Sequence, residues 1–287
     1  MLIVLDPGSG QMCNQMLMQM NILASAYQHS YKVVYYGFRR YNGPVYTSDD
    51  LDGLILEKEK VAFVRSKIAN FVLSICRKLK INSKKVILGS DPKCVNYFLK
   101  ATNKNRKKYW CVGWPFYDLD SLRKNADLIR SYFSPNDEII QYVSSNMGHF
   151  SSGDLIVGVH MRRGDYKIWR GGEFYFDDYV YKKCMDKLFK ELKKKAVHFI
   201  LFSNEKININ NFETKEYKVS IANGSAIQDF YLMSKCDYII GPPSSYNGLA
   251  SFLGKVPRFV VLQKDDDLTL DGMYIWLQET DGWVNPI

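Results

Sequence analysis

Two adjacent arginines follow an apolar segment near the middle of this 287-residue chain. Residues 155–159 predict a buried strand, and Arg162 and Arg163 stand where that strand ends. Because side chains alternate along a strand, His160 and Arg162 point the same way. Open α/β sheets bind ligands at the carboxyl ends of their strands, and guanidinium groups suit phosphate oxygens. We therefore expect a diphosphate site here, with a surface pair neutralised by Asp165 as the plainer alternative.

A second candidate site is the turn at 241–243, which is followed by Ser244 and Ser245. The two hydroxyls coincide with the start of a predicted helix, where backbone N–H groups are free and the helix dipole is positive. Such a helix end binds phosphate readily. Serine is also a preferred N-cap in helices that bind no ligand. The pattern favours a phosphate site and leaves simple capping as the alternative.

Two further polar residues have open roles. Asp229 lies inside a predicted helix at 226–234. It either accepts from a guanine ring or a ribose hydroxyl, or it stabilises the first turn of its own helix. His160 is either a satisfied core residue or a contact to the base or a phosphate. The residue types alone do not decide between these interpretations.

Metal chemistry has the least support in the sequence. The acidic run 265–267 has the composition of the Asp-x-Asp element of metal-dependent glycosyltransferases, but its position after Gln263 and Lys264 favours a solvated turn. The four histidines show no ligand spacing. We predict no metal-ligating residue and no metal cofactor.

Charge and cysteine content limit the class of protein. The net charge of +9 favours anionic partners such as nucleotides, nucleic acid or anionic lipid surfaces. Basic residues gather at 77–85, at 100–108 and on a predicted helix at 182–195, each a solvated face or a docking surface. The six scattered cysteines are typical of a reduced, cytosolic protein. No stretch approaches the ~20 apolar residues of a membrane span. We expect a cytoplasmic protein whose basic clusters allow peripheral contact with the inner membrane surface.

Strands and helices alternate along the chain, which predicts an α/β fold with parallel sheets. In the first half we expect strands at 2–5, 32–37, 86–88 and 109–114, and helices at 11–29, 57–80, 121–133 and 136–147. In the second half we expect strands at 155–162, 197–202, 238–240 and 256–262, with helices between them. The segment 151–153 predicts a boundary between domains 1–150 and 151–287, and the last residues are candidates to pack back on the first domain.

The segment His160-Met161-Arg162-Arg163-Gly164-Asp165-Tyr166 resembles the His-x-Arg-Arg-x-Asp-Tyr signature of the α-1,2-fucosyltransferases, glycosyltransferase family eleven. Further segments are similar to other blocks of this family, namely 10–16 with Asn14, Phe202-Ser203-Asn204, 229–234 and Ser244-Ser245-Tyr246. The chain departs from the family pattern where glycines or a Trp pair are usual, at Gln11, Cys13, Asn247 and Gly248.

The resemblance implies two Rossmann-like domains facing a cleft, the GT-B arrangement, with an acceptor-side N-terminal domain and a C-terminal domain that binds the nucleotide sugar. It also implies inverting, metal-independent transfer of fucose from GDP-fucose to a hydroxyl, galactose O2, of an oligosaccharide or glycolipid acceptor. With the residue pattern, it gives the donor-binding set Asn14, His160, Arg162, Arg163, Asn204, Asp229, Ser244 and Ser245.

Three residues are candidates for the catalytic step. Arg162 would stabilise the charge of the leaving GDP in place of a metal. Asp165 stands beside two arginines and would orient them. Glu173 is the candidate general base, with a carboxylate of the first domain or no protein base as alternatives.

Two other functions stay open at this point. One is a transferase that uses another GDP- or UDP-sugar. The other is a non-catalytic, basic protein that binds nucleotides or nucleic acid. Because the chain carries no nucleic-acid-binding motif, we expect no nucleic-acid partner.

Overall fold

The computed structural model describes residues 2–5, 11–29, 33–36, 61–63, 75, 83–87, 108–112, 117–193 and 196–279. The chain divides into two units, Met1–Ser134 and Pro135–Ile287. Each unit holds a five-stranded sheet. Neighbouring strands run parallel in both sheets. The predicted α/β class with two Rossmann-like domains is therefore confirmed.

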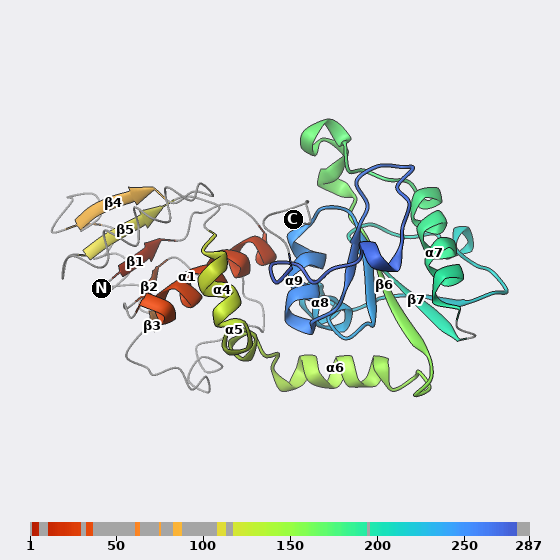
Figure 1. The fold of residues 1–287 in the computed structure, drawn as a ribbon, viewed down its shortest axis with the longest axis horizontal. Coiled ribbons are helices and arrows are strands. Elements are labelled where there is room, and N and C mark those ends of the chain that lie inside the picture. The colour runs from red at the N-terminus through yellow and green to blue at the C-terminus, as the bar shows by residue number, and fades with distance from the viewer. Residues whose placement is uncertain are drawn as a thin grey trace. The chain divides into compact units, whose positions relative to one another are not determined.

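The first unit carries a sheet with the strand order β3-β2-β1-β5-β4 (Figure 1). Its elements are β1 (Leu2–Leu5), α1 (Met12–His29), β2 (Val33–Tyr36), β3 (Val61–Phe63), β4 (Ser83–Ile87), β5 (Lys108–Val112), α4 (Leu119–Lys124) and α5 (Ala126–Tyr132). The helix expected at 57–80 is wrong at 61–63, where β3 pairs with β2 and Val61 lies opposite Val33. Pairing with a neighbouring strand overrides the local helical pattern there. The rest of that expected helix, apart from Ile75, lies outside the described residues.

Helix α1 is buried on all sides over residues 16–26, which explains why its apolar residues are not confined to one stripe. Its buried Asn21 accepts a hydrogen bond from the backbone N–H of Asp118 at 2.9 Å. The hydroxyls of Tyr27 and Tyr132 lie 2.6 Å apart. These bonds tie α1 to the segment that enters α4 and to the end of α5.

The second unit has the strand order β10-β9-β6-β7-β8. Its main elements are α6 (Asp137–Met147), β6 (Leu155–Met161), α7 (Asp178–Leu192), β7 (Val197–Ser203), β8 (Lys218–Ile221), α8 (Ala226–Met233), β9 (Tyr238–Gly241), α9 (Ser245–Gly254) and β10 (Arg258–Val260). Short 3-10 turns are η2 (Gly164–Lys167), η3 (Trp169–Gly172), η4 (Ile209–Asn211) and η5 (Leu270–Gly272). The sequence did not predict β8, because this half-exposed edge strand lacks an apolar run.

The strand order of this sheet reverses between β6 and β9. From β6 the chain adds β7 and β8 on one side, and it then crosses to β9 and β10 on the other. Open α/β sheets bind ligands at the carboxyl ends of the two strands that flank such a reversal. We therefore expect the ligand-binding residues of this unit to follow β6 and β9.

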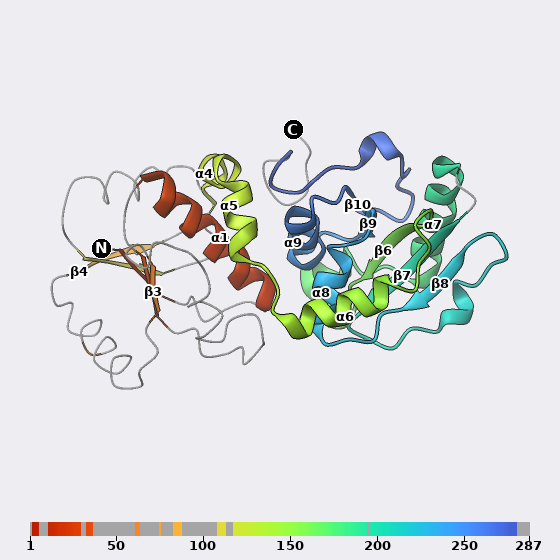
Figure 2. The same ribbon diagram turned by 90° about the horizontal axis from the view of Figure 1, so that it is seen from below.

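Helices cover both faces of the second sheet, with α7 on one face and α8 and α9 on the other (Figure 1, Figure 2). Val157 and Val159 of β6 join the core that α7 covers. Gly158 faces the opposite layer, since a Cβ at this position would lie 3.3 Å from Met233 of α8. A parallel strand that is buried on both faces is a continuous apolar run, as 155–159 is.

The helices of the second unit begin at residues that suit helix ends. The side chain of Asp177 caps α7 by accepting from Val180 N at 3.1 Å. Helix α6 packs along α8 and lies within the second unit. The division between units therefore precedes the boundary predicted at 151–153, and the functional roles expected of the two domains stay predictions.

Gly248 lies in the middle of α9 and leaves room for an indole ring. Trp276, which follows β10, is fully buried against it. A Cβ at position 248 would overlap the indole atoms of Trp276. Gly248 is the second of the two residues, Asn247 and Gly248, that stand where the family usually has a Trp pair, and a tryptophan from elsewhere in the chain fills the space beside it.

We predict that Gly248→Ala lowers the free energy of unfolding by about 1–3 kcal/mol, because the added methyl group overpacks the contact with Trp276. Urea denaturation followed by circular dichroism measures this change. The matched control is Gly153→Ala, where a Cβ meets nothing within 4 Å. Its unfolding free energy should stay within about 0.5 kcal/mol of the original. Equal midpoints for Gly248→Ala and the original protein would contradict the packing.

Candidate functional site

The residues after β6 and β9 are joined by one tyrosine. The hydroxyl of Tyr166 donates to the carbonyl oxygen of Pro243 at 2.5 Å, in the turn that leads into α9. The guanidinium of Arg162 lies over the ring of Tyr166, 5.6 Å from its centroid. Burial raises the pKa of Tyr166 above its usual value, so the phenol stays protonated and keeps donating. Tyr166 thus connects the first arginine with the Pro-Pro-Ser-Ser turn.

Arg162 is held from one side by a carboxylate. Its Nη2 lies 2.8 Å from an oxygen of Asp165. The Arg162 side chain is only 14% exposed, whereas that of Asp165 is 51% exposed. A partly desolvated guanidinium in a fixed orientation is a suitable partner for a phosphate group.

Arg163 points to the opposite face of the sheet. Its guanidinium forms an ion pair with Asp178, at the start of α7. The same alternation that places Arg162 on the α9 side places Arg163 on the α7 side. The structure therefore does not bring the two arginines to one phosphate position.

Ser244 is the N-cap of α9. Its hydroxyl accepts from the backbone N–H of Tyr246 at 3.2 Å, and the residue is buried. Ser245 is the first helical residue and is half-buried. The capping alternative holds for Ser244, and the amide groups of the first turn of α9 remain the anion-binding feature of this end.

His160 sits in a buried polar network that is centred on Asn247. The Asn247 amide nitrogen donates to Pro242 O at 2.8 Å and faces His160 Nδ1 at 3.2 Å. The amide oxygen of Asn247 accepts from Arg258 Nη1 at 2.6 Å. Because that oxygen is engaged by a donor, the nitrogen must face His160. His160 Nδ1 is then the acceptor, and the proton of the neutral ring is on Nε2.

Arg258 is a buried cation at the start of β10. Its guanidinium lies over the rings of Tyr274 and Trp276, with Cζ 5.6 Å and 5.0 Å from their centroids. Burial lowers the pKa of Arg258 to about 10, so the group stays charged at neutral pH. Within the described part of the chain, its hydrogen-bonded anchor is the amide of Asn247 rather than a carboxylate. Aromatic faces and an amide dipole therefore hold this charge.

Asp229 has structural partners. It accepts from Tyr142 of α6 at 2.9 Å and from the backbone N–H of Gly224 at 3.0 Å. Burial raises the pKa of Asp229 above its usual value. The carboxylate thus fixes the loop after β8 at the same edge of the sheet. Tyr246 joins this region to α9, since its hydroxyl donates to Ala226 O at 2.7 Å.

Asn204 follows β7 and supports the turn after β6. Its side-chain oxygen accepts from the backbone N–H of Arg163 at 2.8 Å. Glu205 accepts from Gly164 N at 3.1 Å. Gly164 has φ +59°, and a Cβ there would lie 2.7 Å from the Asn204 amide nitrogen, so only glycine fits.

Glu173 is exposed at the end of the excursion formed by η2 and η3. Arg170 in this excursion has φ +51°. Ile168 at its tip is 83% exposed. Asn14 belongs to the first unit, in the first turn of α1 after β1. The roles expected of Glu173 and Asn14 therefore stay predictions.

The acidic run 265–267 is engaged by protein groups. Asp265 pairs with Lys183 at 3.5 Å, and Asp267 pairs with Lys187. Asp266 accepts from Leu262 N and Gln263 N. The described residues contain no group of three or more His, Cys, Asp or Glu side chains that could hold a metal ion. Among the helices of the described segments, none combines the length and apolar character that crossing a bilayer requires.

The family model described as Glycosyl transferase family 11 matches residues 63–264. The chain belongs to glycosyl transferase family 11. It is therefore a glycosyltransferase, and the resemblance to the family of α-1,2-fucosyltransferases is confirmed. No curated protein sequence matches this glycosyltransferase significantly.

Solved structures share the fold of this glycosyltransferase. A mutant of Arabidopsis thaliana FUT1 in complex with GDP has a TM-score of 0.62 and 10% identity, and the match covers 90% of this chain and 69% of that chain. The α-1,6-fucosyltransferase NodZ soaked with GDP-fucose has a TM-score of 0.56 and 13% identity, with coverages of 95% and 96%. POFUT1 in complex with GDP has a TM-score of 0.54 and 11% identity, with coverages of 88% and 94%. The fold is of the GT-B type, as predicted.

Four residues of this site had no role in the sequence analysis. Tyr166 was part of the arginine motif, and Asn247 was noted only as a departure from the family. The sequence feature that could have indicated Arg258 is its position as a charged residue inside the apolar segment 256–262. Nothing in the sequence pointed to Tyr142, because its hydrogen bond to Asp229 of α8 depends on how α6 packs.

The buried imidazole of this glycosyltransferase predicts a pH-dependent stability. Burial and the charges of Arg162 and Arg258 lower the pKa of His160 to about 3. Below about pH 6.5 the His160 imidazole is protonated in the unfolded chain, whereas it stays neutral in the folded chain. The free energy of unfolding therefore falls, by up to about 1.4 kcal/mol per pH unit, as pH drops from about 6.5 toward about 3.

Urea unfolding at several pH values, on the original protein and on His160→Gln, measures this slope. His198, whose pKa is also lowered by burial, is present in both proteins and cancels from the difference. The variant should lose part of the acid sensitivity. Parallel stability curves between about pH 7 and about pH 5 would show that His160 does not contribute.

Proposed function

We propose that the protein transfers fucose from GDP-fucose to a hydroxyl, galactose O2, of an oligosaccharide or glycolipid acceptor, with inversion and without a metal. The observation that carries this proposal is the Tyr166 bridge. It puts Arg162 and the N-terminal end of α9 together at the carboxyl ends of β6 and β9. Structures of the same fold that contain GDP or were soaked with GDP-fucose support this choice of donor.

Arg162 and the first turn of α9 would bind the diphosphate. When the bond between the anomeric carbon and GDP breaks, negative charge develops on the leaving phosphate. A guanidinium and backbone N–H groups that already point at this position stabilise the charge without reorganising. Asp165 would keep the Arg162 guanidinium in place through its ion pair. In this proposal, Arg163 and Asn204 shape the turn and do not contact phosphate.

His160 and Asp229 are proposed to select the base. With its proton on Nε2, His160 can donate to an oxygen or nitrogen acceptor of guanine. Asp229 has carboxylate lone pairs beyond those used by Tyr142 and Gly224 and can accept from guanine N–H groups or a ribose hydroxyl. Asn14, in the first unit, stays a proposed donor contact.

Glu173 is the proposed general base. The acceptor hydroxyl would lose its proton to the Glu173 carboxylate as its oxygen bonds to the anomeric carbon, and GDP would leave from the opposite face. The Glu173 carboxylate is exposed at the end of a loop whose backbone is left-handed at Arg170. It forms no hydrogen bond or ion pair with the described residues. Such a group is suited to contact a substrate.

The charge distribution bears on the alternative of nucleic-acid binding. Lys183 and Lys187 on α7 pair with Asp265 and Asp267, which neutralises part of that basic face. Peripheral contact with the inner membrane surface would then depend on the clusters at 77–85 and 100–108, of which only residues 83–85 and 108 are among the described residues. Cytoplasmic placement belongs to the same proposal.

We predict that Arg162→Ala lowers kcat for fucose transfer by about 100- to 1,000-fold, because one preorganised donor to the leaving group is lost. Mass spectrometry of a galactoside incubated with GDP-fucose measures transfer, and thermal unfolding checks the fold. The charge-matched control is Lys183→Ala on α7, which should transfer as the original does. Full activity of Arg162→Ala would remove the proposed role. Tighter calorimetric binding of UDP than of GDP would reject the donor.

We predict that Glu173→Gln lowers kcat at least about 100-fold, because the base is lost while the shape is kept. The affinity for GDP should not change, since Glu173 is not in the donor site. The acid limb of the pH–rate profile should disappear in the variant. Glu213→Gln, at another exposed glutamate, is the control. A variant with original kcat would leave the reaction with another base or none.

A further inference from the structure

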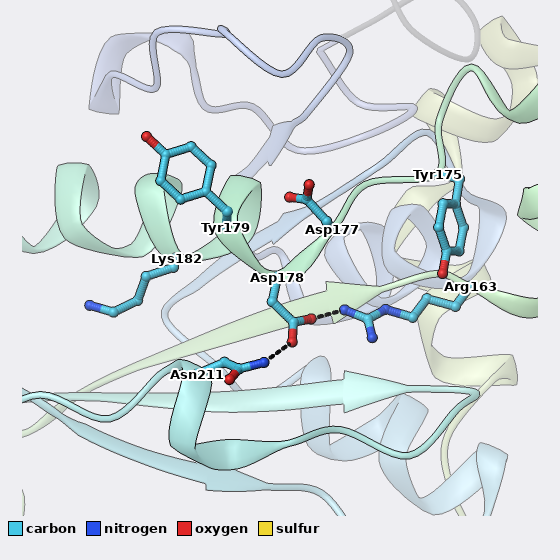
Figure 3. A pocket seen from close by; sticks show the side chains of 7 residues that line it. All are labelled: Arg163, Tyr175, Asp177, Asp178, Tyr179, Lys182 and Asn211. Carbon is cyan, nitrogen blue, oxygen red and sulfur yellow. Dashed lines mark hydrogen bonds and ion pairs between the residues drawn. The ribbon is translucent and has the colours of Figure 1, made fainter.

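A polar pocket opens on the α7 side of the second sheet, away from the Tyr166 bridge. It encloses about 540 Å³, within the roughly 300–1,000 Å³ common for small-molecule sites. Its walls come from the end of β6, the segment before α7, the first turns of α7 and η4 (Figure 3). Nothing in the donor-binding proposal uses this pocket.

One side of the pocket is a fixed array of hydrogen-bonding groups. Asp178 pairs with Arg163 through one oxygen and accepts from Asn211 through the other at 2.6 Å. Figure 3 shows Arg163 and Asn211 meeting this carboxylate from two directions. Arg163 Nε is buried and has no hydrogen-bond partner among the described residues. A buried donor without a partner is costly, so this guanidinium is not fully satisfied by its own chain.

The charges that line the pocket balance. Arg163 and Lys182 are cationic, and Asp177 and Asp178 are anionic. Lys182 is further neutralised by Asp186, 2.6 Å away. A diphosphate or another strongly anionic group would gain little here. A neutral ligand with several hydroxyl groups would find both donors and acceptors.

Two tyrosines give the pocket its apolar surface. Tyr179, on the first turn of α7, is 74% exposed and points outward from the helix (Figure 3). Tyr175 stands on the opposite side of the pocket and packs partly against the core. An exposed phenol offers a flat apolar face and a polar tip. Such a face fits the C–H side of a pyranose ring, while the polar array fits its hydroxyls.

The geometry points to this pocket as a binding site for a sugar unit of the acceptor glycan, with Tyr179 as the stacking face and Arg163, Asp178 and Asn211 as the hydroxyl-binding array. This assignment rests on the proposed function, because it supplies the acceptor side of that transfer. Arg163 begins at the end of β6, beside Arg162. The pocket and the proposed donor site therefore belong to the same unit and lie on opposite faces of the strand end that carries the two arginines.

The test measures binding of neutral disaccharides in the absence of donor. Lactose, N,N′-diacetylchitobiose and maltose are titrated against the full-length protein by saturation-transfer NMR. We expect saturable binding of at least one disaccharide, weakened about tenfold by Tyr179→Ala and by Asn211→Ala, and retained in Tyr179→Phe. In the transfer assay, the two alanine variants should raise KM for acceptor and leave kcat unchanged.

The matched control is Asn210→Ala, an exposed neighbour of Asn211 outside the pocket. It should bind the disaccharides as the original protein does, and all variants should bind GDP equally. No saturable binding by the original protein overturns the assignment, as do pocket variants that bind like Asn210→Ala. If the sugars bind in the pocket but the protein transfers no fucose from GDP-fucose, the proposed function is rejected and the sugar-binding site is retained.

Discussion

Side-chain alternation along β6 is the constraint on which the site depends. Because the strand is buried on both faces, each residue must meet one helix layer or the other. Val157 and Val159 pack toward α7, and Arg163 continues on that side to Asp178. His160 lies on the other side, and Arg162 continues there to Tyr166. Two adjacent guanidinium groups thereby acquire different surroundings, one beside the N-terminal end of α9 and one in the pocket on the α7 side. A register shift of one residue would exchange them.

Cross-links between strand ends keep this arrangement in place. Tyr166 joins the segment after β6 to Pro243 after β9, and Asn247 joins the same turn to His160 and to Arg258 of β10. Every hydrogen-bonding atom of the Asn247 amide is used, so the amide has one orientation. Buried networks whose polar atoms are engaged are rigid and costly to disturb. The rigidity matters because transition-state stabilisation depends on donors that do not have to move.

Two neighbouring positions at which the chain departs from the family pattern are internal. Asn247 and Gly248 are both buried in α9. Asn247 organises the polar network beneath the turn, and Gly248 makes room for Trp276, whose ring also faces the guanidinium of Arg258. Gly248, Trp276 and Arg258 are therefore packed together, so the position of each depends on the other two. The two departures change the support of the proposed donor site rather than the surface that an acceptor meets.

The sequence by itself determined the α/β class, the strands of the second sheet except β8 and the motif at Arg162, because apolar periodicity and strand ends are local properties. It did not predict β3 or β8, whose formation depends on strand partners distant in the sequence. Only the tertiary structure decided that Arg163 turns to Asp178, that Asp229 meets Tyr142 and that Arg258 joins the His160 network. Each of these contacts joins separate elements, and which partner a polar side chain finds depends on how helices and strands pack.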